Sequence, residues 1–76
     1  MTRLPVVSGR DMIRYLSDKG FASRSARGSH VFLSRRNDDG TFTTTTVPLH
    51  RELDTGMLIG ILKDVGIERE QFIREW

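Results

Sequence analysis

Two histidines are the side chains of this sequence that are best suited to proton transfer. His30 follows Gly28-Ser29 directly and opens an apolar run, and His50 stands two residues after a proline. The imidazole of histidine titrates near neutral pH, so it can take a proton from a substrate or return one. At position 30 it can serve as a general base, as a nucleic-acid contact, or as a half-buried side chain bonded to a backbone carbonyl.

The residues around His30 are of types that bind phosphate. Gly28 has no Cβ, so a sugar–phosphate backbone can approach the chain closely there. The Ser29 hydroxyl can hydrogen-bond a phosphate oxygen or orient the imidazole. His50 can act as a general acid or bind phosphate, although its position favours an ordinary histidine of a surface loop. Arginines suit phosphate contacts and can stabilise charge on phosphoryl oxygens, and those near the triplet are Arg24, Arg27 and Arg35.

Two other kinds of site find little support in the sequence. The two histidines are twenty residues apart and the chain has no cysteine, which matches no recognised metal-ligand spacing. A serine hydrolase presents its nucleophile on a sharp turn, whereas Ser29 directly precedes His30. We therefore expect neither a metal nor a cofactor.

Positive charge is concentrated in the first half of the chain. The formal net charge of the 76 residues is +2, but residues 1–36 carry +6 and residues 37–76 carry −4. Seven of the eight cations in the first segment are arginines. This asymmetry favours a polyanion such as RNA as the partner of the first half, although solvated charge on a small domain gives the same pattern.

The first part of the chain has the pattern of a capped amphipathic helix. Ser8 and Asp11 have the spacing of a capping box. Apolar residues then recur at helical spacing until Gly20, which suits the left-handed end of a helix. The pattern predicts a helix over about residues 9–19.

The middle of the chain predicts three strands, over residues 21–27, 30–35 and 41–47. The first two are separated by Gly28-Ser29, and Asn-Asp-Asp-Gly at residues 37–40 is a turn signal for a hairpin. Four consecutive threonines suit the third strand. Pro48 ends that strand because it has no N–H for the ladder.

The second half predicts two helices packed on the sheet. Asp54 is the expected N-cap of a helix that Gly66 ends, and residues 68–76 have the spacing of a short helical tail folding back onto the core. Residues 1–76 then form a single α+β domain with the two-layer order α-β-β-β-α, in which helices back one face of an antiparallel sheet. The core is expected to contain Ile13, Leu16, Val31, Leu33, Leu58, Ile61 and Leu62.

The segments "KGF", "RGSHVFL" and "VPLHRELDTGMLIGILKDVGIEREQF" carry a resemblance to a known family. With these motifs in this order, the sequence resembles the HicA family of type II toxin–antitoxin toxins. The resemblance implies a fold like the double-stranded-RNA-binding domain, ribonuclease activity on mRNA, and neutralisation by a HicB-type antitoxin. Ser25-Ala26 stands where such proteins often carry Arg-Gln, and Met57 where they often carry threonine.

Three functions follow from these observations. The first is a metal-independent endoribonuclease toxin, an mRNA interferase, with His30 as base, His50 as a possible auxiliary residue, and RNA bound by Arg24, Arg27, Gly28, Ser29 and Arg35. The second is a non-catalytic RNA-binding module that reads shape through phosphates and 2′-hydroxyls. The third is a decayed toxin that only holds its antitoxin. Only the first needs a titrating base.

The sequence also bears on the cellular location. Residues 1–7 lack the apolar run of a signal peptide, and no segment approaches the roughly 20 apolar residues of a membrane span. We therefore expect a cytoplasmic protein that does not enter a membrane.

Overall fold

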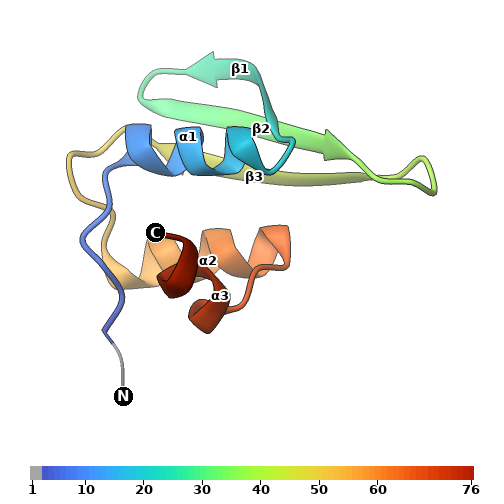
Figure 1. Cartoon of the computed structure of the whole chain (residues 1–76). Helices are drawn as coiled ribbons and strands as arrows, with labels where there is room; N and C mark the ends of the chain where they lie inside the picture. The colour runs from blue at the N-terminus through green and yellow to red at the C-terminus, as the bar shows by residue number, and fades with distance from the viewer. Residues whose placement is uncertain (1–2) are drawn as a thin grey trace.

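The computed structural model describes residues 3–76, and its elements follow the predicted order (Figure 1). They are α1 (Gly9–Asp18), β1 (Ala22–Arg27), β2 (His30–Arg36), β3 (Phe42–Pro48), α2 (Thr55–Val65) and α3 (Arg69–Glu75). The strands form one antiparallel sheet in the order β1-β2-β3. The predicted α+β layout with a helical tail is confirmed. Met1 and Thr2, which belong to the signal-peptide argument, lie outside the described residues.

The two longer helices begin and end where their capping residues indicate. The side chains of Ser8 and Asp54 each accept a hydrogen bond from the backbone N–H three residues later, at 3.0 and 2.8 Å. Gly20 and Gly66 follow the helices with positive φ angles of 93° and 73°. After Gly20, the Phe21 N–H donates to the Leu16 carbonyl, and after Gly66, the Ile67 N–H donates to the Leu62 carbonyl. A hydrogen bond of this span is usual where a glycine ends a helix.

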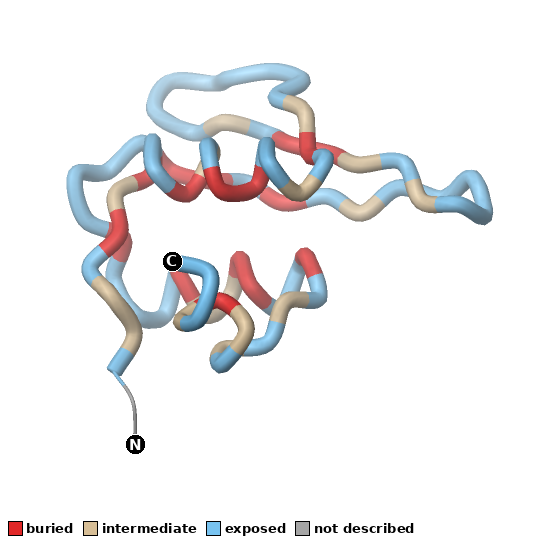
Figure 2. Tube along the Cα trace, viewed as in Figure 1, coloured by how far each residue is buried: buried red, intermediate tan, exposed pale blue. Residues whose placement is uncertain are grey.

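The sheet packs one face against the helices and leaves the other face open. Leu33 and Val47 are fully buried, and the Thr45 hydroxyl donates a hydrogen bond to Asp64 Oδ2 of α2 at 3.0 Å. Phe32, the neighbour of Leu33 on β2, is 39% exposed. Because successive strand residues point to opposite faces, Phe32 marks the face that no helix covers. Buried residues gather where the helices face the sheet, and the hairpin ends are exposed (Figure 2).

The turn between β2 and β3 is one residue longer than predicted. The register pairs Arg36 with Phe42, so the turn runs from Asn37 to Thr41 and Thr41 does not belong to the strand. The Asn37 backbone N–H donates to the Thr41 carbonyl at 2.7 Å, and Asn37 Nδ2 donates to the Thr41 hydroxyl at 3.0 Å. These bonds hold the fifth turn residue.

A β-bulge interrupts the pairing of β1 with β2. Ser23 pairs with Leu33, whereas Ser25 pairs with Phe32, so Arg24 between them has no partner of its own on β2. The register of β1 against β2 therefore shifts by one residue at Arg24.

The last helix completes the hydrophobic core. Phe72 of α3 is fully buried, and its ring meets the Tyr15 ring of α1 edge-on with centroids 5.0 Å apart. Of the predicted core residues, Ile13 and Val31 are only partly buried and pack against the core, whereas the other five are buried. The core also includes Met12, Val65 and Phe72, which belong to the apolar stripes of the predicted helices, and residues outside those stripes, namely Val7, Tyr15, Phe21, Val47 and Leu53.

Glu75 ties α3 to α1. Its Oε1 accepts a hydrogen bond from the Tyr15 hydroxyl at 2.7 Å and lies 2.6 Å from Lys19 Nζ. The hydrogen bonds from Lys19, Tyr15 and Gln71 lower the pKa of Glu75 to about 2. The pKa of Tyr15 is raised, mainly because burial desolvates its hydroxyl and secondly because that hydroxyl donates a hydrogen bond to Glu75. The Glu75 carboxylate therefore favours the folded chain as long as it stays ionised.

We expect part of the stability of this fold to disappear as the pH falls from about 5 to about 2. Glu75 has a lower pKa in the folded chain than its ordinary value of 4.5, so it stabilises the fold above that value, and the contribution vanishes as the pH falls through the folded pKa. Over this range the free energy of unfolding of Glu75→Gln should therefore fall by less than that of the parent. Urea unfolding at a series of pH values measures the difference, and equal decreases in both proteins would exclude this role of Glu75.

Candidate functional site

A tight turn carries His30 to one end of the sheet. Gly28 and Ser29 form the two-residue turn between Arg27 and His30, which are paired across β1 and β2. Gly28 has a φ of 58°, and a glycine with positive φ at the first turn position is typical of tight hairpins. Paired residues of antiparallel strands share a face, and both side chains here are exposed. The turn therefore presents a guanidinium and an imidazole at neighbouring positions of the open face.

The register of β2 and β3 brings His50 to the same place. His30 pairs with Pro48, and the Leu49 N–H donates to the Ser29 carbonyl at 2.6 Å beyond that pair. The imidazoles of His30 and His50 lie edge-on, with ring centroids 6.5 Å apart and planes inclined at 73°. Both histidines are exposed. Two residues distant in the sequence thus form a pair at the end of the sheet where the β1–β2 turn meets the β3–α2 loop (Figure 1).

The first turn of α1 fixes the loop that carries His50. The Gly9 N–H donates to the His50 carbonyl at 2.9 Å. A Cβ on Gly9 would lie 2.9 Å from Leu49 Cα and would overlap the carbonyl oxygen of Pro48. The helix can therefore start against the end of β3 only because residue 9 has no side chain. The backbone of His50 is held by this contact while its imidazole stays exposed.

Two of the predicted RNA-binding arginines lie on the open face. Arg27 is exposed and is paired with His30. Arg24 is exposed at the bulge, and its Nε donates to the hydroxyl of Ser34 at 2.9 Å. Ser34 is two residues from Phe32 on β2 and so shares the open face. The hydrogen bond to a neutral hydroxyl orients the Arg24 guanidinium and does not neutralise its charge.

Arg35 is not brought near His30. It lies five residues further along β2, roughly 17 Å away at 3.3 Å per residue, and on the other face of the sheet. Its guanidinium carbon is 4.6 Å from the centroid of the Phe21 ring, and its Nη1 donates to the Lys19 carbonyl at 3.3 Å. Arg35 therefore covers a core residue at the end of α1 and cannot share a phosphate with His30.

Within residues 3–76, no three side chains of the metal-binding types are grouped to hold an ion, and no helix is long and apolar enough to cross a membrane.

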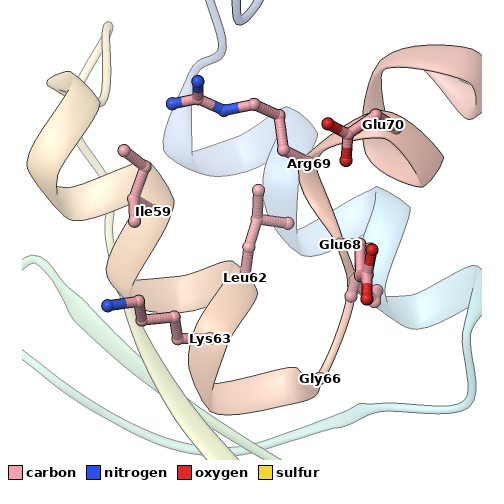
Figure 3. A pocket seen from close by; sticks show the side chains of 8 residues that line it. Ile59, Leu62, Lys63, Gly66, Glu68, Arg69 and Glu70 are labelled. Carbon is pink, nitrogen blue, oxygen red and sulfur yellow. The ribbon is translucent and has the colours of Figure 1, made fainter.

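A groove of about 540 Å³ lies where α2 ends and α3 begins (Figure 3). Its lining contains neither histidine, and the paired imidazoles lie instead on an open surface. The groove is lined by Ile59, Leu62, Lys63, Gly66, Ile67, Glu68, Arg69 and Glu70.

Comparison with protein families identifies the family of the chain. Residues 9–67 match the family described as the HicA toxin of bacterial toxin–antitoxin systems. The chain belongs to the HicA toxin family. It is therefore the toxin of a toxin–antitoxin system and has an antitoxin as its partner. The matched segment contains both histidines, whereas α3 lies beyond it. No curated protein matches the chain.

The sequence of this HicA toxin did not indicate that Phe32 is exposed. The alternation along β2 places Phe32 and His30 on one face, but it does not reveal which face the helices cover. An aromatic residue in a strand usually suggests core, whereas this one is exposed beside the histidine pair. The signal that identifies it is the run of buried residues on the opposite face of β2 and β3, Leu33, Thr45 and Val47.

We expect Gly9→Ala to destabilise the fold by about 1–3 kcal/mol, because the added methyl group must displace the backbone of the loop before His50. The matched control is Gly60→Ala within α2, where an added Cβ meets nothing within 4 Å. That variant should gain up to about 1 kcal/mol from helix propensity. Urea unfolding measures both changes, and a Gly9→Ala protein as stable as the parent would show that the close approach is not required.

Proposed function

We propose that this HicA toxin is an endoribonuclease that cleaves mRNA without a metal and uses His30 as its general base. The observation that carries the proposal is the exposed imidazole of His30, held at a tight turn on the same face as the Arg27 guanidinium. A neutral imidazole can remove the proton from a 2′-hydroxyl, which then attacks the neighbouring phosphorus. The guanidinium can stabilise the charge that develops on the phosphoryl oxygens.

The open face of the sheet is the proposed RNA-binding surface. Arg24 and Arg27 supply positive charge for phosphates, and Gly28 and Ser29 let the RNA backbone approach the turn. Phe32 adds an exposed aromatic ring on which an unpaired base can stack. Arg35 does not belong to this surface, because its guanidinium lies against the other face.

The antitoxin of this system is, in the same proposal, a HicB-type protein that covers the His30 region. A free ribonuclease in the cytoplasm would damage the RNA of its own cell, so the partner has to block the reacting groups. The exposure of the imidazole and of the surrounding open face leaves this surface accessible to such a partner.

His30→Ala should fold like the parent and cleave RNA about 10²–10⁴-fold more slowly, because the variant lacks only an exposed proton acceptor. Thermal unfolding and RNA cleavage measured on the same preparation check both statements. The parent should remain active in excess chelator, and its 5′ fragments should end in 2′,3′-cyclic phosphate or its opened form.

Each part of this proposal can fail separately. A stable His30→Ala protein that cuts at the parental rate would remove His30 from catalysis. Loss of parental activity in chelator, restored by Mg²⁺, would contradict the metal-free mechanism. A parent that binds RNA without cutting it would favour the non-catalytic RNA-binding module.

RNA binding should depend on the charge of the open face. Arg24→Gln with Arg27→Gln should weaken binding to all RNA sequences and reduce the slope of log affinity against log salt by about 0.7 for each phosphate that the protein no longer neutralises. Arg74→Gln on α3 is the matched control and should keep the parental slope. Anisotropy titrations with labelled RNA, in the His30→Ala background, measure the slopes. An unchanged slope in the double variant would move the binding surface elsewhere.

A further inference from the structure

We propose that His50 is a second catalytic residue, the general acid that protonates the leaving oxygen while His30 acts as base. This inference rests on the proposed ribonuclease function. It is carried by the approach of the two exposed imidazoles, whose ring centroids are 6.5 Å apart although they stand on separate segments of the chain. Histidine suits both roles, since the neutral ring accepts a proton and the protonated ring donates one.

The fold does not require a histidine at position 50. The hydrogen bonds that hold residues 49 and 50 are made by backbone atoms, with the His50 carbonyl accepting from the Gly9 N–H and the Leu49 N–H donating to the Ser29 carbonyl. Any residue at position 50 could supply that carbonyl. The exposed imidazole is therefore free to act on a bound substrate.

The chemistry needs two groups on opposite sides of one phosphorus. His30 takes the proton from the 2′-hydroxyl, and the 2′-oxygen forms a bond to phosphorus while the bond from phosphorus to the 5′-oxygen breaks. The departing 5′-oxygen is a poor leaving group as an alkoxide, and it takes the proton of the His50 imidazolium. The products are a 2′,3′-cyclic phosphate and a 5′-hydroxyl end. His30 ends protonated and His50 neutral, and exchange with water restores both.

The separation of the rings fits one phosphate between them. A general acid or base works at about 2.6–3.2 Å from the oxygen it serves. Two imidazoles in direct contact would leave no room for the attacking and leaving oxygens, and two rings much further apart could not reach both. Ring centroids at 6.5 Å with steeply inclined planes allow each ring to face a different oxygen of the same group. Arg27 on the open face is available for the remaining phosphoryl oxygens.

The test uses the leaving group to separate acid from base. An RNA oligonucleotide that the parent cuts is prepared with either oxygen or sulfur at the 5′ bridging position of the cut linkage, since a thiolate leaves without a proton. His50→Ala should cut the oxygen substrate about 10²–10⁴-fold more slowly than the parent. It should cut the sulfur substrate at close to the parental rate. His30→Ala should be slow on both, because each reaction still needs the 2′-hydroxyl proton removed.

The outcomes are distinguishable. His50→Ala that is equally slow on both substrates would show that His50 binds RNA or shapes the site and is no acid. His50→Ala that matches the parent on oxygen would remove it from the reaction. Failure to find any RNA that the purified, folded parent cuts would overturn the proposed ribonuclease function itself. Thermal unfolding checks that the variants are folded, and His50→Gln repeats the comparison with a side chain that preserves polarity.

Discussion

The register between β2 and β3 is the constraint on which the rest of the site depends. The Leu49 N–H extends the ladder to the Ser29 carbonyl at 2.6 Å, and these two residues immediately precede His50 and His30. A slip by one residue would turn the side chains of one strand to the other face. The register is held from both ends, by the hydrogen-bonded turn at Asn37 and by burial of Val47 against the helices.

The helices were predictable from the sequence because their signals are local, whereas the histidine pair was not. The predicted four-residue turn would pair Arg36 with Thr41 and thus His30 with Val47, a fully buried residue. One extra turn residue pairs His30 with Pro48 instead, which is also buried but lies on the face opposite to that of Val47. The side-chain hydrogen bond from Asn37 to Thr41 stabilises the longer turn, and the hydrophobic periodicity of the strands does not predict this bond. The contact of Tyr15 with Glu75, sixty residues apart, is equally invisible to local patterns.

Backbone and side chains have separate tasks at this site. Gly9 and the carbonyl of His50 hold the loop through main-chain atoms, so the fold places no demand on the imidazole. For Arg35, by contrast, the side chain itself is used by the fold. Its guanidinium lies over the Phe21 ring and donates to the Lys19 carbonyl at the end of α1. Arg35 was grouped with Arg27 because the two are close in the sequence. Strand geometry places Arg35 on the face that packs against the helices and Arg27 on the open face.

The bulge at Arg24 allows two arginines of β1 to serve one face of the sheet. Residues three apart on a regular strand point to opposite faces, so Arg24 and Arg27 would be separated. In regular pairing counted back from the Arg27–His30 pair, Arg24 would stand opposite the fully buried Leu33. Because Arg24 is unpaired at the bulge, its guanidinium lies instead on the open face, where it donates to the Ser34 hydroxyl. The positive charge of that face thus depends on the number of residues in β1 as well as on their identity, and changes of length in this edge strand can redistribute charge without replacing any arginine.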